Sequence, residues 1–459
     1  MYSYNQDKKE KEYLEKQKSS HPDLFKVETI IEDDNLLKSI GITSSERLRE
    51  IFYVKTSAVD FIVEEKNVLF GQTSVSHKVL TTPKDSLDKR TIFVTLVKCN
   101  MQTTDAIADI ARKLGISTAD ISYAGLKDKK AITSQTVAIR KTKFENLLKV
   151  ISPYYFLKDA TYGNGILKMG DLVSNQFTIC LRPTEILTEE TFSNIEQKIR
   201  EIEKNGFRNF YYLQRFSAPR YTNMQWGFLI FKGEFSEAIK LSILQKGQNE
   251  LSFFQNIRDS LSSVYGDWKK MQDILEPFNV SFSTERRLID YLVENPNDYL
   301  GALRSIPEQV RLWIYSVPSY FFNVLISNKT TEDLLLQKKA PLILTKELGD
   351  LMPYRDMLME NDLFPVPDNA LKNFNFIEFK KREVSVLSYP HNLTIKREGE
   401  LVLVQFSLEK GEYATTFLSQ VVTLAQPGED FMQKTQYSFD TVEPEFLETL
   451  QYFVDVIEE

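Results

Sequence analysis

The pattern of hydrophobic and polar positions changes twice along the chain. In the first part, alternating and β-branched runs predict strands at residues 60–65, 91–98, 136–140 and 176–182. From residue 207 to about 382 the apolar spacing becomes helical and aromatic residues are dense. After residue 385 strand alternation returns at 392–397 and 401–408, followed by a predicted helix at 415–424. A β-rich chain that is interrupted by a helical block and then resumes indicates an inserted domain.

Two predicted helices of the first part carry signals for their ends. The run 103–115 predicts a helix with Thr103 or Thr104 as its N-cap and Gly115 as its C-terminal cap. The run 188–206 predicts a second helix, which ends at its terminal glycine. Helices placed between strands in this way are typical of a mixed α+β domain.

We therefore expect an α+β protein of two domains, since 459 residues exceed one ordinary core. Residues 46–205 and 386–459 are expected to form a catalytic domain, with a central, mostly antiparallel sheet flanked by helices. Residues 206–385 are expected to form a mainly helical inserted domain. Residues 1–45 would be a charged N-terminal extension, and the many Lys and Glu residues of its first half indicate a solvated surface helix.

Composition excludes several classes of protein. No apolar run approaches the ~20 residues that span a bilayer, and the N-terminus lacks the apolar core of a signal peptide, so we expect a cytoplasmic protein, or a nuclear one in a eukaryote. Two cysteines and three widely separated histidines predict neither a disulfide framework nor a metal centre. The chain has no P-loop and no glycine-rich dinucleotide motif, and we expect no cofactor.

The charge balance bears on a nucleic-acid partner. The net charge of -7 argues mildly against RNA binding, because phosphates favour basic surfaces. RNA binding needs only one positive face, however, and two stretches are locally basic: Lys127, Lys129, Lys130, Arg140, Lys141 and Lys143, and then Arg208, Arg215 and Arg220.

One polar segment, residues 122–131, carries candidate chemistry. Asp128 stands between Lys127 and Lys129 in a predicted loop between a helix and a strand. Nearby cations keep a carboxylate ionised, and an ionised carboxylate on a loop held by rigid elements is a plausible nucleophile or base. Lys-Asp-Lys alone is a weak signal, because a surface turn with solvated charges is its more common meaning.

The longer sequence around this acid resembles the TruD family of pseudouridine synthases, whose Ala-Gly-x-Lys-Asp-x-x-Ala-x-Thr-x-Gln motif carries the catalytic aspartate. The segment here is YAGLKDKKAITSQ. Other segments resemble the family's motifs in the family's order: VKTSAVDFIVEE, LVKCNMQTTDAI, LKMGDLVSNQFTICLR, NFYYLQRFSAPRYTNMQWG, VPSYFFN and EKGEYATTFL. The resemblance runs from about Ile51 to Val422, and seven ordered matches make coincidence a poor explanation.

The resemblance implies that the chain isomerises uridine to pseudouridine in RNA, in particular in the D-arm region of tRNA. It implies that Asp128 is the catalytic carboxylate, acting either on C1′ or on the C2′ proton, and that Lys55 is its ion-pair partner, with Lys127 second. Four further positions match the family's uridine pocket: Phe61, Asn175, Phe177 and Tyr413. Arg215 would contact phosphate or support the fold. We expect a monomer without a metal.

Several residues depart from the family pattern, and they leave two other functions open. Tyr212, Ser217 and Ser174 replace glycines, Pro318 replaces a glutamine, and the segment 409–412 replaces Pro-Pro-Gly-Ser. A non-catalytic relative that binds or chaperones tRNA is one alternative. A hydrolase that uses Asp128 with a second carboxylate such as Glu65 is the other, since glycosidic hydrolysis needs two acids.

Overall fold

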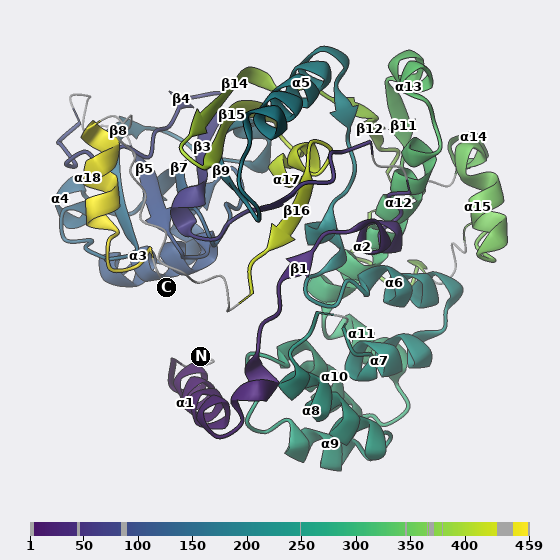
Figure 1. Cartoon of the computed structure of the whole chain (residues 1–459). Coiled ribbons are helices and arrows are strands. Elements are labelled where there is room, and N and C mark those ends of the chain that lie inside the picture. The colour runs from purple at the N-terminus through teal and green to yellow at the C-terminus, as the bar shows by residue number, and fades with distance from the viewer. Residues whose placement is uncertain are drawn as a thin grey trace. The chain divides into compact units, whose positions relative to one another are not determined.

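The structure is a computed structural model that describes residues 4–43, 46–83, 90–247, 249–344, 347–364, 366, 371–378, 380–428 and 444–457. The chain forms two compact units (Figure 1). The helical unit comprises Met1–Ser45 and Arg208–Leu387, and the sheet unit comprises Glu46–Phe207 and Ser388–Glu459. The two internal boundaries of the helical block lie within two residues of the predicted ones. Residues 1–45, which we expected as a separate extension, belong to the helical unit.

A mixed, mostly antiparallel sheet forms the centre of the sheet unit, as the sequence predicted. Its strands are β2 (Ile51–Tyr53), β3 (Phe61–Asn67), β4 (Gly71–Gln72), β5 (Thr91–Cys99), β6 (Ile121–Tyr123), β7 (Ile132–Arg140), β8 (Tyr155–Gly163), β9 (Leu172–Pro183), β14 (His391–Glu398), β15 (Leu401–Glu409) and β16 (Thr423–Gln426). The central order is β16-β2-β9-β3-β7-β5-β8, and β9 also pairs with β15, which in turn pairs with β14. Only β16 with β2 and β3 with β7 run parallel among the described pairs of this unit.

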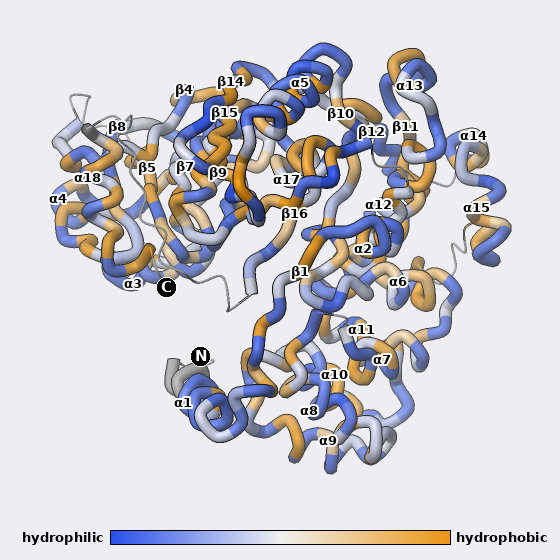
Figure 2. Tube along the Cα trace, in the orientation of Figure 1, coloured by the Kyte–Doolittle hydropathy of each residue, from blue (hydrophilic) through white to orange (hydrophobic). Residues whose placement is uncertain are grey.

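Helices cover both faces of this sheet. They are α3 (Thr103–Leu114), α4 (Phe144–Leu147), α5 (Glu189–Asn205), α17 (Ala414–Leu418) and α18 (Pro444–Tyr452). Helices α3 and α4 pack on the face of β5 that carries Val94 and Leu96, whereas α18 packs on the face that carries Val97 and Cys99. Helix α5 buries only a narrow apolar stripe, and Figure 2 shows its remainder as mostly hydrophilic.

The helical unit has one extensive apolar cluster. Its helices are α1 (Tyr4–Ser20), α2 (Asp34–Ser39), α6 (Asn223–Lys232), α7 (Phe235–Leu244), α8 (Ser252–Ser263), α9 (Trp268–Ile274), α10 (Ser283–Glu294), α11 (Tyr299–Arg304), α12 (Pro307–Ser327), α13 (Thr331–Gln337), α14 (Leu348–Leu351) and α15 (Arg355–Glu360). The short strands β11 (Lys339–Pro341) and β12 (Glu383–Ser385) pair antiparallel. Helices α6 and α12 touch at Gly227, where an added Cβ would lie 2.2 Å from the Trp313 carbonyl oxygen. None of the described helices is long and apolar enough to cross a bilayer.

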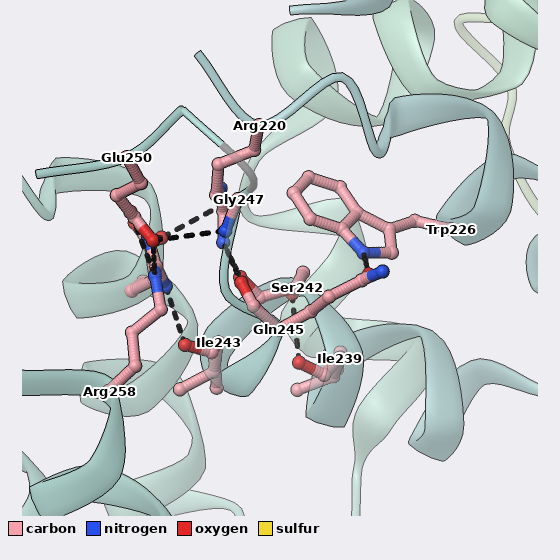
Figure 3. A network of polar contacts seen from close by, with 10 residues as sticks. Arg220, Trp226, Ile239, Ser242, Ile243, Gln245, Gly247, Glu250 and Arg258 are labelled. Carbon is pink, nitrogen blue, oxygen red and sulfur yellow. Dashed lines mark hydrogen bonds and ion pairs between the residues drawn. The ribbon is translucent and has the colours of Figure 1, made fainter. Parts of the chain in front are cut away.

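Buried charges link the helices of this unit (Figure 3). Arg258 is paired with Glu250 at 2.8 Å and with Glu285 at 3.1 Å, and Arg220 reaches Glu285 at 3.3 Å. The Arg220 guanidinium also donates to the carbonyl oxygens of Ser242 and Gln245. Because each charge has partners of opposite sign or backbone acceptors, the network is satisfied and serves the fold.

The N-terminal helix α1 is anchored to this unit by one buried carboxylate. Glu10 is only 3% exposed and accepts hydrogen bonds from the amides of Val280 (2.6 Å) and Ser281 (2.9 Å). Most of the other described residues of α1 are exposed, as expected of a charged surface helix. The helix is thus the expected charged surface helix, with Glu10 as a buried exception, and Tyr13 and Leu14 also pack against the apolar cluster.

Four local predictions differ from the structure. Helix α17 ends at Leu418, and the last predicted helical residues begin β16, because they pair with β2. Gln102, and neither Thr103 nor Thr104, is the N-cap of α3. Strands β7 and β9 each begin four residues before their predicted ranges, 136–140 and 176–182. The predicted glycine ends are confirmed, with φ of 66° at Gly115 and 78° at Gly206.

Candidate active site

Asp128 lies in the loop 124–131 between β6 and β7. Three buried side chains anchor the backbone of this loop by hydrogen bonds: Lys98 (to Asp128 O, 2.6 Å), Gln135 (to Gly125 O, 3.0 Å) and Thr103 (from the Lys127 amide, 3.1 Å). The Thr103 hydroxyl can accept this hydrogen bond because it does not cap helix α3. The loop is therefore held by strand β5, strand β7 and helix α3 at once.

The Asp128 carboxylate forms an ion pair with the Lys55 ammonium. The Asp128 side chain stays 39% exposed, whereas Lys55 is 21% exposed. Burial by itself raises the pKa of the Asp128 carboxyl, but the charge and hydrogen bond of Lys55, with help from Lys98, outweigh it and hold the pKa below its usual value. The carboxylate is thus ionised at neutral pH and still reachable from solvent.

Buried residues hold the turn that carries Lys55 in place. Lys55 has a φ of 58°, a left-handed conformation that costs energy in a residue with a Cβ. Its ammonium lies 3.9 Å from the centroid of the Phe61 ring. Asp60, fully buried, accepts a hydrogen bond from the Ser57 amide in the same turn and is paired with Arg182 on β9 at 3.0 Å. The buried pair holds the turn, and the turn aims Lys55 at the carboxylate.

Lys127 does not contact the Asp128 carboxylate. Its ammonium lies 2.7 Å from Glu65 Oε2, and the two side chains are 3% and 0% exposed. Glu65 also accepts a hydrogen bond from the Thr136 amide of the neighbouring strand at 3.3 Å. Lys127 therefore ties the loop to β3, and of the two candidates for the ion-pair partner of Asp128 it is Lys55, the first, that makes the contact.

The other predicted pocket residues fall into two groups. Phe61 and Phe177 are 2% and 5% exposed, with ring centroids 6.0 Å apart, so both belong to the core beneath the site. Asn175, opposite Glu65 on the adjacent strand, is half-buried, and its Oδ1 atom has no hydrogen-bond partner among the described residues. Tyr413 is half-buried at the start of α17.

Arg215 lies in the helical unit, in the short 3₁₀ helix Leu213–Phe216. Its guanidinium stands 5.2 Å from the centroid of the Tyr211 ring. The sheet unit brings together Asp128, Lys55, Phe61 and the buried Lys127–Glu65 pair, and Arg215 belongs to the other unit.

Sequence reasoning missed Lys98 as a residue of the site. This lysine is fully buried on β5, and burial lowers its pKa to about 8, although Asp128 partly opposes that effect. The only signal in the sequence is a lysine within the otherwise apolar run 91–98, since a charge in a buried strand needs a reason.

Comparisons with known proteins identify the family. A family model described as tRNA pseudouridine synthase D (TruD) matches residues 51–348. A probable tRNA pseudouridine synthase D 1 of Methanocaldococcus jannaschii is 26% identical over 385 residues, which cover 80% of this chain and 95% of the relative. A relative of the same kind from Thermococcus gammatolerans is 30% identical over 308 residues, which cover 66% of this chain and 68% of that protein.

A solved structure of tRNA pseudouridine synthase D (TruD) from Methanosarcina mazei has the same fold, with a TM-score of 0.63 and 23% identity over 83% of this chain and 96% of that chain. Together with the family model, the relatives place the chain among the enzymes that isomerise uridine in RNA. The chain belongs to the TruD family.

Proposed function

We propose that this protein isomerises a uridine of tRNA, in or near the D-arm, with Asp128 as the catalytic carboxylate. The observation that carries the proposal is an ionised, partly exposed carboxylate, paired with Lys55 on a loop that buried side chains hold rigid. We also propose that the protein is cytoplasmic. We propose further that it acts as a monomer, because the carboxylate and its partners come from one unit of one chain.

The reaction needs an ionised carboxylate by either route. Asp128 attacks C1′ and displaces N1 of the uracil, or it removes the C2′ proton, and in both cases the C1′–N1 bond breaks. The uracil then rotates, C5 bonds to C1′, and the C5 proton is lost to water. Since the pKa of Asp128 is lowered, the carboxylate carries its charge at neutral pH without a separate base.

Binding of the uracil fits the remaining residues of the site. The target nucleotide must leave its stack to reach Asp128. We propose that Oδ1 of Asn175 accepts the N3–H of the uracil, because this acceptor lacks a partner of its own. Phe61 and Phe177 would form the wall beneath the base, and Tyr413 would close its side. Arg215 remains a proposed phosphate contact.

The hydrolase alternative has less support than isomerisation. A glycosidic hydrolase needs a second carboxyl group that faces the bond being broken. Glu65, the candidate for that role, is fully buried and paired with Lys127. No structural feature of this kind argues against the binding-only alternative. A measurement of turnover distinguishes it from the isomerase.

The deciding experiment measures tritium release from tRNA labelled at C5 of uridine. We expect release by the wild-type protein, with one labelled position in the D-arm region converted to pseudouridine and no free uracil. Tight tRNA binding without any release would favour the binding-only function. Free uracil would favour the hydrolase.

Lys98 should link stability to pH in a measurable way. Its folded pKa of about 8 lies below the ordinary 10.5, so between these values the unfolded chain binds the proton more strongly and stability rises with pH. Relative to Lys98→Met, wild type should gain about 2 kcal/mol between pH 7 and pH 9.5, measured by chemical denaturation. The exposed Lys66→Met is the matched control and should show no such change. Parallel stability curves for wild type and Lys98→Met would contradict the prediction.

The same substitution should slow the reaction. Without Lys98 the Asp128 carbonyl loses its 2.6 Å hydrogen bond, and the loop is free to shift. Because a reacting group that is misplaced by about 1 Å can slow a reaction about 100-fold, we expect kcat to fall roughly 10- to 100-fold, with less effect on KM. Single-turnover rates at saturating enzyme measure that loss directly.

A further inference from the structure

A basic hollow lies in the sheet unit, away from the catalytic loop. It has a volume of about 740 Å³ and is lined by Arg90, Arg140, Lys141, Lys143 and Asn146, among others. These residues gather where β5 begins and β7 ends, and where α4 starts. The chemistry derived above uses none of them.

The hollow keeps a clear excess of positive charge. Asp120 is the carboxylate paired there, at 3.5 Å from Arg140 and 3.1 Å from Lys141. Among the described residues, four cations of the hollow thus face one acid, on a chain whose net charge is -7. Glu145 is exposed on α4 but does not line the hollow. An acidic protein that binds RNA must do so through local surfaces of this kind.

The donors of the hollow have unused capacity. The side chain of Lys141 is 73% exposed, and Lys143 is exposed and forms no ion pair within the described ranges. Arg140 is 41% exposed, although its Nη2 already donates to the Ala119 carbonyl oxygen and its Nε is buried. Phosphate oxygens are the acceptors that such a group of guanidinium and ammonium donors fits.

The strands fix how far the hollow lies from the chemistry. Lys98, near the end of β5, holds the Asp128 carbonyl, whereas Arg90 immediately precedes the start of β5. Eight residues of extended strand separate them by roughly 26 Å. A double-helical arm of an RNA held at Asp128 therefore reaches the hollow if it runs this distance along β5.

We propose that this hollow binds the phosphate backbone of a double-helical arm of the same RNA whose uridine is bound at Asp128. The proposal rests on the proposed function. The contact adds affinity for a folded, full-length RNA without reading its sequence, because phosphate contacts position a nucleic acid and do not distinguish bases.

The test compares Lys141→Gln/Lys143→Gln with a control of equal charge change. The control is Lys204→Gln/Lys396→Gln, two exposed lysines on α5 and β14, at the opposite edge of the sheet. Binding and turnover are measured on full-length tRNA and on a short stem-loop that carries only the target uridine.

We expect the Lys141→Gln/Lys143→Gln protein to bind full-length tRNA roughly 10-fold more weakly, with a salt dependence of log Kd that is shallower by about 2. Its kcat on full-length tRNA at saturation, and its kinetics on the stem-loop, should match wild type. Unchanged binding of full-length tRNA, an equal loss on both RNAs, or an equal loss in the control protein would overturn the proposal. Absence of turnover by wild type on either RNA would instead remove the proposed function.

Discussion

Replacement of Asp128 by asparagine is expected to lower the rate of pseudouridine formation by roughly 10⁴-fold or more, the scale seen when a covalent or proton-transfer residue is lost. Asparagine keeps the shape and the hydrogen bond from Lys98 to the main chain, since that bond uses the backbone carbonyl. What it loses is the negative charge that Lys55 stabilises and that either route requires. Single-turnover tritium release measures the loss over this range.

The affinity of the Asp128→Asn protein for tRNA shows whether the substitution affects the reaction or RNA binding. Asp128→Asn removes a negative charge near a polyanion, so its Kd for tRNA should stay the same or decrease. Asp120→Asn is a useful comparison, because Asp120 also pairs with cations but takes no part in the proposed chemistry. Isomerisation by Asp128→Asn at more than a hundredth of the wild-type rate would falsify the catalytic assignment.

The second large effect concerns the buried pair of Lys127 and Glu65. Lys127→Met leaves the Glu65 carboxylate buried without its counter-ion, which costs about 3–5 kcal/mol of stability. The loss should be concentrated in the sheet unit, where Glu65 also binds β7. Because a chain with two compact units need not unfold in one step, amide hydrogen exchange of β3 and β7 is the appropriate measurement.

Two comparisons make this prediction specific. Glu65→Gln/Lys127→Met removes both charges and should recover most of the stability, since two neutral groups carry a smaller desolvation penalty. Lys129→Met, two residues along the same loop and exposed, should change stability by less than about 0.5 kcal/mol. If the single and double variants at Glu65 and Lys127 were equally unstable, the ion pair would not be the cause.

The sequence predicted local structure well where hydrophobic periodicity decides it. Strands β5 and β9 were predicted from apolar positions that recur every two residues, and helices α3 and α5 from apolar positions that recur every three to four. Both periods depend only on neighbours along the chain. Two of the failures share one origin. Residues 423–426 became a strand through pairing with β2, and Thr103 left its capping role for the Lys127 amide. Tertiary partners overrode local preference in both cases.

The sequence by itself determined the family, the candidate carboxylate and the α+β class, because ordered motifs and periodicity are properties of the chain. Only the tertiary structure decided which cation serves which acid. Lys55, 73 residues from Asp128 in sequence, pairs with it, whereas its chain neighbour Lys127 turns inward to Glu65. The reason is physical: adjacent residues in a loop point in different directions, and the strands beneath determine which charges meet and which are buried.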